Sequence, residues 1–247
     1  MATAELDISQ RPPAKTLRKR SLYRDAARRF LRNRLSIIGL VIVFMLLVVA
    51  IFADDWFVAP LLGREPQPLI AHYGFDEAFV GPTGGFPSAD FWMGTDLNGR
   101  DEWSRIVYGA RISLSIAIFS QLLALCIGLP MGALAGWKGG KIDFVIMRIV
   151  DIMSALPVLL LAFLIMLRMG ASYWNVLLAL SLTTWIEICR LTRGQFLTLR
   201  EKEFVEASRS VGARTPRIVF SQILPNALAP IIVSVTLGVP RAIFAEA

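Results

Sequence analysis

The sequence predicts an all-α, polytopic membrane protein. Of its 247 residues 55% are hydrophobic, and the mean hydropathy of +0.58 is too high for an ordinary soluble domain. Uncharged runs such as residues 35–53 and 112–137 are long enough to cross about 30 Å of hydrocarbon as helices. Together these two observations indicate a chain that buries much of its apolar surface in a bilayer.

The first 34 residues form a basic tail. They hold ten of the 26 Lys and Arg residues and only three of the 19 acids, so they account for the whole net charge of +7. Leu22, Ala26 and Phe30 recur every four residues among arginines, which predicts a basic amphipathic helix suited to an anionic lipid surface. A presequence is the competing interpretation, but the basic region is too long for a signal peptide. We therefore expect a retained tail that contacts lipid and no binding face for nucleic acid.

Five transmembrane helices are expected in all. The spans are residues 35–53, 112–137, 144–167, 173–189 and 227–247, and the sequence stops inside the last one. Residues 54–107 are acidic and rich in Gly and Pro, so we expect an irregular extracytoplasmic segment there, followed by a core domain over residues 108–247. Lys and Arg residues number twenty on the side of the tail and four or five on the other. This asymmetry predicts that the tail and the loop at residues 190–226 are cytosolic.

Few side chains outside the loop at residues 190–226 suggest a catalytic or ligand-binding role. His72 is the only histidine and stands apart from Cys126 and Cys189, which we expect to be small core hydrophobes, so we predict no metal site. Arg148 and Asp151 have the i, i+3 spacing of an ion pair, and the remaining charges within the apolar stretches are Glu187 and Arg241. The sequence contains no phosphate-binding loop with its lysine and no catalytic triad. We therefore expect no cofactor and no enzymatic activity, and any energy for transport must come from a partner.

The long polar loop at residues 190–226 has the pattern of a helical hairpin. Thr198 and Glu201 have the spacing of a capping box, which predicts a helix that begins there and ends at Gly212. Thr215 and Pro216 predict the start of a second helix that runs to Leu224. Helical periodicity places Phe204, Ala207 or Ser208, and Val211 on one face of the first helix, with Glu203, Glu206 and Arg209 off that face. An ordinary amphipathic helix that packs on its own chain is the plain alternative.

The residue pattern of this loop resembles the EAA loop of bacterial ATP-binding cassette importer permeases. The matching residues are Glu206-Ala207-Ser208, Gly212 and Leu224-Pro225, with Ser where the motif name has Ala. The resemblance implies that the loop docks into an ATPase subunit. Phe204, Ala207, Ser208 and Val211 would then supply the apolar contact, and Glu203 and Glu206 the polar anchoring. Gly212 would form the turn, and Pro225 would sharpen the return into the last span.

A second motif stands before the span at residues 112–137. It comprises Gly94, Thr95, Asp96, Gly99, Arg100 and Asp101. A calcium loop is excluded because the fifth and sixth positions from Asp96 are Arg100 and Asp101. The stretch is similar to the entry of the core in the second permease subunit of the dipeptide, oligopeptide and nickel permease family, and Gly139 to Asp143 adds a further match.

The resemblance covers residues 93–247 and implies a MetI-like permease fold with six spans. It also implies a homologous permease subunit, two ATPase subunits and an external solute-binding protein as partners, with peptides as the favoured solutes over nickel or sugars. A secondary transporter or channel that works without ATP, using Asp151, Glu187 or Arg241, is the rival hypothesis. A membrane assembly factor without a transport role is the third.

Overall fold

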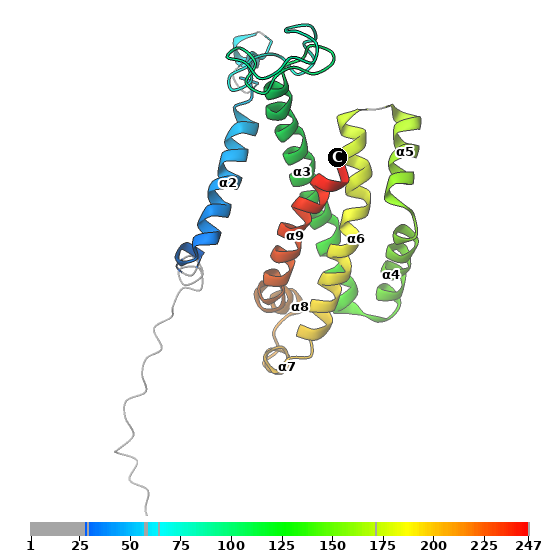
Figure 1. Ribbon diagram of the computed structural model, residues 1–247. Coiled ribbons are helices and arrows are strands. Elements are labelled where there is room, and N and C mark those ends of the chain that lie inside the picture. The colour runs from blue at the N-terminus through cyan, green and yellow to red at the C-terminus, as the bar shows by residue number, and fades with distance from the viewer. Residues whose placement is uncertain (1–27, 29, 57–58, 64, 171, 247) are drawn as a thin grey trace, which may run out of the picture. The chain divides into compact units, whose positions relative to one another are not determined.

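The computed structural model describes residues 28, 30–56, 59–63, 65–170 and 172–246, apart from the side chain of residue 246. Most of these residues are helical (Figure 1). The chain divides into two units, residues 1–46 and 47–247, and each is considered by itself. The basic amphipathic helix expected in the tail lies almost entirely outside the described residues.

Helix α2 (Arg34–Ile51) contains the first apolar run. Its 18 residues extend over about 27 Å at 1.5 Å per residue, which is close to the thickness of a hydrocarbon core. The helix is apolar around its whole circumference, and Ala50 is its only buried residue. Such a surface is suited to lipid.

Residues 52–101 form an irregular segment that packs on the N-terminal end of α3 (Glu102–Lys138). The only regular element in its described part is a short 3₁₀ turn, η2 (Ala59–Leu62). Ala53, Ala71 and Val107 form a small core, and the Ser104 hydroxyl accepts hydrogen bonds from two backbone amides of the segment at 3.0 Å each. The Arg111 guanidinium adds an ion pair with Asp54 at 2.9 Å. The extracytoplasmic segment expected from composition is therefore ordered on one helix end.

Helix α3 is 37 residues long and packs along α6 (Tyr173–Leu199). Gly128, Gly132 and Gly136 lie one helical turn apart on the face of α3 that meets α6. A Cβ atom added at Gly132 would lie 2.4 Å from the carbonyl oxygen of Cys189, so the two backbones are closer than any side chain allows. Small residues at such positions are the usual device for close helix packing in membranes. Small residues on the contact face of α3 thus account for its close packing on α6.

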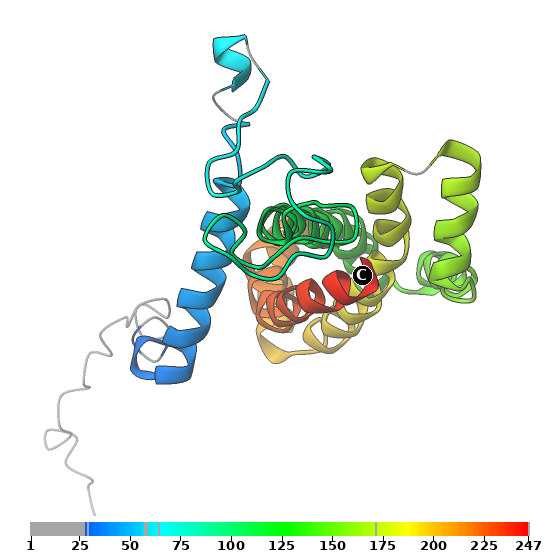
Figure 2. The same cartoon turned by 45° about the horizontal axis from the view of Figure 1, so that its top comes forward.

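The stretch predicted as one span at residues 144–167 is broken into two helices. These are α4 (Gly140–Ser154) and α5 (Val158–Met169), and they bend by 79° at the break. Pro157 lacks an amide hydrogen and disfavours helical backbone at Leu156, so the break falls directly before it. Figure 2 shows α6 between α3 and α5. The span predicted at residues 144–167 therefore corresponds to a bent pair of helices, with the bend beside Pro157.

Helix α6 continues ten residues beyond the span predicted to end at Cys189. The capping box at Thr198 and Glu201 is also wrong, because Thr198 lies inside α6 and its hydroxyl donates to the carbonyl oxygen of Gly194. Thr192 and Phe196 are fully buried, and Phe196 packs directly against Gly136. This tertiary contact prolongs the helix past the point where local polarity predicts its end.

The chain then forms the hairpin of α7 (Glu203–Ser210) and α8 (Thr215–Ile218), followed by η3 (Val219–Ile223) and α9 (Leu224–Glu246). Residues 215–245 make one continuous helix. The expected role of Pro225 in sharpening the return into the last span stays a prediction, but Pro225 does not end a helix. The reason is the π-helical turn η3, in which the Leu224 amide bonds to Val219 five residues earlier and so accommodates the missing amide of Pro225.

Among the described residues, three helices are long and apolar enough to cross a membrane, and the bent pair α4 and α5 makes a fourth candidate. They are α2, α3 and the continuous helix 215–245. Helix α6 has the length, but Asn175, Glu187 and Arg190 lower its hydropathy. It contacts α3, α4, α5 and α9, so most of its surface faces protein rather than lipid. Asn175 is buried among these neighbours, whereas Glu187 and Arg190 are exposed and each forms an ion pair with a neighbouring helix.

Two further expectations are corrected by the structure. Arg148 does not pair with Asp151, because its guanidinium lies over the Phe144 ring while Asp151 pairs with Arg190 at 3.0 Å. Side chains three residues apart on a helix can meet, but here a neighbouring helix offers the closer partner. Cys189 is buried as expected, whereas Cys126 is exposed because it points away from α6.

Candidate functional site

The loop expected to contact an ATPase is a compact hairpin at one end of the bundle of α3, α6 and α9 (Figure 1). Val205 of α7 is fully buried in a cluster with Phe196, Ile218 and Ile223. The Arg209 guanidinium lies 5.2 Å from the centre of the Trp137 ring at the end of α3. The hairpin is therefore anchored to three helices of its own chain by one apolar and one cation–π contact.

The predicted contact face of α7 is exposed in this chain. Phe204 is 39% exposed and Val211 83% exposed, and Ala207 is exposed beside them. Glu203 and Glu206 are also exposed, whereas Ser208 is half-buried and bonds to the Gln222 amide at 2.7 Å. The residue that packs on its own protein is thus Val205, which the periodicity did not select. In a helix of eight residues, spacing alone cannot separate Val205 from its neighbour Phe204.

Gly212 ends α7 as expected. Its φ of +77° is in the left-handed region that favours glycine, and its amide bonds to the carbonyl oxygen of Arg209 at 2.9 Å. A pocket of about 580 Å³ lies beside this turn and is lined by Val211, Arg214 and Arg217 among others. Leu224 and Pro225 begin α9, with Leu224 half-buried against the Val205 cluster and Pro225 exposed.

The turn between α3 and α4 is tied to the base of α6. Gly139 and Gly140 both have positive φ, and Asp143 forms a bidentate pair with Arg193 at 2.5 and 2.6 Å. The Arg200 guanidinium donates to the carbonyl oxygen of Gly136 at 3.1 Å. The match at Gly139 to Asp143 thus has a structural basis, since it makes a sharp turn and places the carboxylate against α6.

The second motif builds the cap of α3 and no metal site. One oxygen of Asp96 accepts from the backbone amides of Asn98 and Arg100, and the other pairs with Arg105 at 2.7 Å. The Arg100 amide above all, with the Asn98 amide and the Arg105 charge, holds the pKa of the Asp96 carboxyl below its usual value. Asp101 caps α3 by accepting from the Ser104 amide at 3.0 Å. The carboxylates that suggested a calcium loop are thus bonded within the chain.

The other motif residues fold the loop onto itself. The Thr95 hydroxyl donates to the carbonyl oxygen of Pro82, and Arg100 lies 3.6 Å from Asp76. Gly94 has φ of +81°, and an added Cβ would meet the Gly85 carbonyl oxygen at 2.4 Å. Within the described residues, no group of His, Cys, Asp and Glu is arranged to hold a metal ion.

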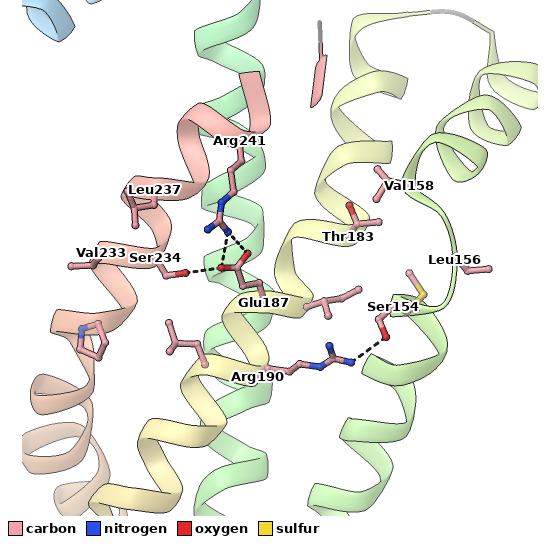
Figure 3. Close-up of a pocket in the computed structure, with 14 residues that line it drawn as sticks. Ser154, Leu156, Val158, Thr183, Glu187, Arg190, Val233, Ser234, Leu237 and Arg241 are labelled. Carbon is pink, nitrogen blue, oxygen red and sulfur yellow. Dashed lines mark hydrogen bonds and ion pairs between the residues drawn. The ribbon is translucent and has the colours of Figure 1, made fainter. Parts of the chain in front are cut away.

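A separate pocket of about 780 Å³ lies between the break of α4 and α5, helix α6 and helix α9 (Figure 3). Arg241 of α9 donates to both carboxylate oxygens of Glu187 at 2.9 Å, and Ser234 lies 3.4 Å from the same group. Arg190 reaches the other way, to Asp151 at 3.0 Å and Ser154 at 3.1 Å. The sequence identified Asp151, Glu187 and Arg241 as charges within apolar stretches. Arg190, Ser154 and Ser234 were missed because only the fold brings three helices to one pocket.

Comparison with known proteins gives matches along most of the chain. Residues 128–247 match the model of the binding-protein-dependent transport system inner membrane component, and residues 21–81 match that of the N-terminal transmembrane domain of oligopeptide transport permease C. The oligopeptide transport system permease protein OppC of Bacillus subtilis is 39% identical over 227 residues, which cover 92% of this chain and 70% of that protein. The dipeptide transport system permease protein DppC of the same organism is 40% identical over 226 residues, covering 92% and 66%.

A glutathione transport system permease protein, GsiD of Pectobacterium atrosepticum, is 34% identical over 228 residues, with 92% of this chain and 71% of that protein covered. Among solved structures, an inward-facing form of the MetNI methionine ABC transporter aligns with 57% of this chain and 70% of its own, with a TM-score of 0.51 and 24% identity. That likeness concerns the fold alone, and it agrees with the MetI-like permease fold expected from the sequence.

Proposed function

The chain belongs to the family of inner-membrane components of binding-protein-dependent transport systems, in its oligopeptide and dipeptide permease branch, and we propose that its α7–α8 hairpin couples peptide transport to ATP hydrolysis by partner subunits. It is a transmembrane permease subunit of an ATP-binding cassette importer. Its relatives are permeases and not the ATPases of such systems.

The exposed apolar face of the hairpin is the observation that supports coupling most directly. Phe204 and Val211 expose large apolar surface at the end of the bundle, while Val205 behind them is fully buried. Burial of such residues against a partner removes apolar area from water, which favours association. Glu203 and Glu206 border this face and supply charges for a polar rim.

The continuous helix at residues 215–245 supports a mechanical role. Because α8, η3 and α9 follow one another without a loop, a displacement of the hairpin would move α9 as well. The anchoring of Val205 and Arg209 extends the same displacement to α6 and α3. Closure of the ATPase dimer would thus change which side of the membrane a cavity between permease subunits faces.

The partners in this proposal are a homologous permease subunit, two cytosolic ATPase subunits and an external solute-binding protein. The distribution of Lys and Arg supports a cytosolic N-terminus and hairpin. Peptides are the proposed solutes because the relatives are named for oligopeptide, dipeptide and glutathione transport. Nickel and sugars serve as competing solutes in the uptake assay.

The test compares Glu206→Lys and Gly212→Pro with wild type in vesicles that contain the complete importer. Both variants should insert and hydrolyse ATP, while the amount of solute taken up per ATP falls by about tenfold or more, because the hairpin carries the coupling contact. Asp90→Lys is the matched control, because it makes the same charge reversal on an exposed acid in the segment at the opposite end of α3. Unchanged coupling in both hairpin variants would refute the proposal.

The rival functions give different results in the same vesicles. Solute uptake that proceeds without the ATPase subunits would indicate a secondary transporter. Failure of the ATPases to co-purify with this chain, together with absent uptake, would indicate an assembly factor.

A further inference from the structure

The charged side chains at the pocket between α4, α6 and α9 belong to stretches expected to span the membrane, where burying a charge has a large free-energy cost. Glu187, Asp151 and Arg241 lie in stretches that the sequence assigns to the membrane, and their side chains are 58%, 58% and 63% exposed in this chain. Half-exposed charges do not face lipid hydrocarbon, since they are tolerated in membranes only against water or protein. In a membrane this face of the bundle must therefore meet water or protein.

The charges of the pocket balance one another. Glu187 and Arg190 lie one turn apart on α6, and each pairs outward, with Arg241 on α9 and with Asp151 on α4 (Figure 3). Asp151 lies outside the pocket lining but pairs with Arg190, so the two ion pairs together carry two positive and two negative charges and no net charge. A site for a cation or an anion would present an excess of the opposite charge. An alternating set instead matches a solute that carries both charges and is neutral overall.

From these observations we infer that Glu187 and Arg241, with Arg190 beside them, form a transient binding site for the free amino and carboxyl termini of a zwitterionic peptide. This inference rests on the proposed function and specifies the chemistry of its solute. The ammonium group of the peptide binds the Glu187 carboxylate, and the carboxylate of the peptide binds a guanidinium. Ser234 and Ser154 offer hydroxyl groups at the same depth.

The ion pairs already present make such binding weak and reversible. A zwitterion that enters the pocket breaks the ion pair between Glu187 and Arg241. Each of these two side chains then pairs with the oppositely charged terminus of the solute. Existing ion-pair contacts are thus exchanged for equivalent ones, so little net affinity is gained. A transport pathway needs sites that are favourable enough to enter and weak enough to leave. The volume of about 780 Å³ is within the range of small-molecule pockets.

The test measures water access and solute protection at one introduced cysteine in the assembled importer. In a background with Cys126→Ala and Cys189→Ala, Val233→Cys places a thiol on the pocket wall. Ile232→Cys is the matched control, because Ile232 is 58% and Val233 57% exposed but Ile232 does not line the pocket. A charged methanethiosulfonate reagent should modify Val233→Cys about tenfold faster or more than Ile232→Cys, because the reagent does not enter lipid.

Solute protection then identifies the ligand chemistry. Alanylalanine at millimolar concentration should slow modification of Val233→Cys, whereas N-acetyl-alanylalanine and alanylalanine amide should protect less. Glu187→Gln should abolish the difference between alanylalanine and its N-acetyl form, and Arg241→Gln the difference from the amide. Glu187→Asp retains the charge and should retain protection, which provides a second variant if Glu187→Gln fails to assemble. Arg148→Gln removes a charge of α4 outside the pocket and should change nothing.

Two results would overturn the inference. One is equal modification of Val233→Cys and Ile232→Cys, and the other is equal protection by free and blocked dipeptides. ATP-driven uptake of alanylalanine by the wild-type importer, measured in parallel, separates this outcome from failure of the proposed function. Intact uptake without protection refutes the pocket assignment alone, and absent uptake refutes the peptide importer itself.

Discussion

Close packing of α3 against α6 gives the sharpest prediction about stability. In Gly132→Ala the new Cβ would lie 2.4 Å from the Cys189 carbonyl oxygen, 2.8 Å from the Thr192 Cβ and 3.1 Å from the Arg193 amide nitrogen. Two of these three neighbours are backbone atoms of a helix, so they cannot rotate away. The helices must separate by several tenths of an ångström along the contact.

The expected cost is about 1–3 kcal/mol of unfolding free energy, the usual range for overpacking a well-packed interior. Gly194→Ala is the matched control, because it is also a helical glycine but has no atom within 4 Å of the added Cβ. Alanine is favoured over glycine in a helix by about 0.8–1 kcal/mol, so this control should be neutral or stabilising.

The assay uses the native Cys189 as a reporter. Cys189 is fully buried at the α3 contact, whereas Cys126 is exposed and is replaced by alanine. Modification of the Cys189 thiol by a fluorogenic maleimide during heating then reports separation of the two helices. Gly132→Ala should react at a lower temperature than the parent. Equal melting of Gly132→Ala and the parent, or equal destabilisation by Gly194→Ala, would refute the packing argument.

Two further predictions concern ion pairs and pH. A double-mutant cycle with Asp143→Asn and Arg193→Gln should give a coupling free energy of about 0.5–3 kcal/mol in thermal unfolding, because the bidentate pair joins α4 to α6; additive effects would contradict it. Because the folded pKa of Asp96 lies below its ordinary value of 3.8, its contribution is present above about pH 3.8 and disappears as the pH falls through the folded pKa. Asp96→Asn should therefore raise the rate of amide hydrogen exchange in residues 94–101 at neutral pH, and it should remove the loss of protection that the wild type shows at acidic pH. Identical protection in variant and wild type would count against this role.

The candidate site divides into parts that local pattern determines and parts that it does not. The turn at Gly212 and the exposed position of Phe204 and Val211 follow from short-range signals. The burial of Val205 does not, because it depends on Phe196 and Ile223, which lie 9 and 18 residues away along the chain. The same limit applies to Asp151, whose sequence neighbour Arg148 was the wrong partner and whose actual partner Arg190 lies on α6.

The sequence by itself determined the all-α membrane class, the approximate positions of the apolar helices, the hairpin turn and the family. These features depend on composition, on periodicity and on short motifs. All of them can be recognised from residues close together in the sequence, without any tertiary contact. Only the tertiary structure decided that α6 runs on to Leu199, that the backbone stays helical over residues 215–245 and that Glu187, Arg190 and Arg241 line one pocket, with Asp151 paired to Arg190. The physical reason is that helix ends and ion pairs depend on which atoms lie closest in space, and those atoms belong to residues far apart in the sequence, as where Gly136 of α3 meets Phe196 of α6.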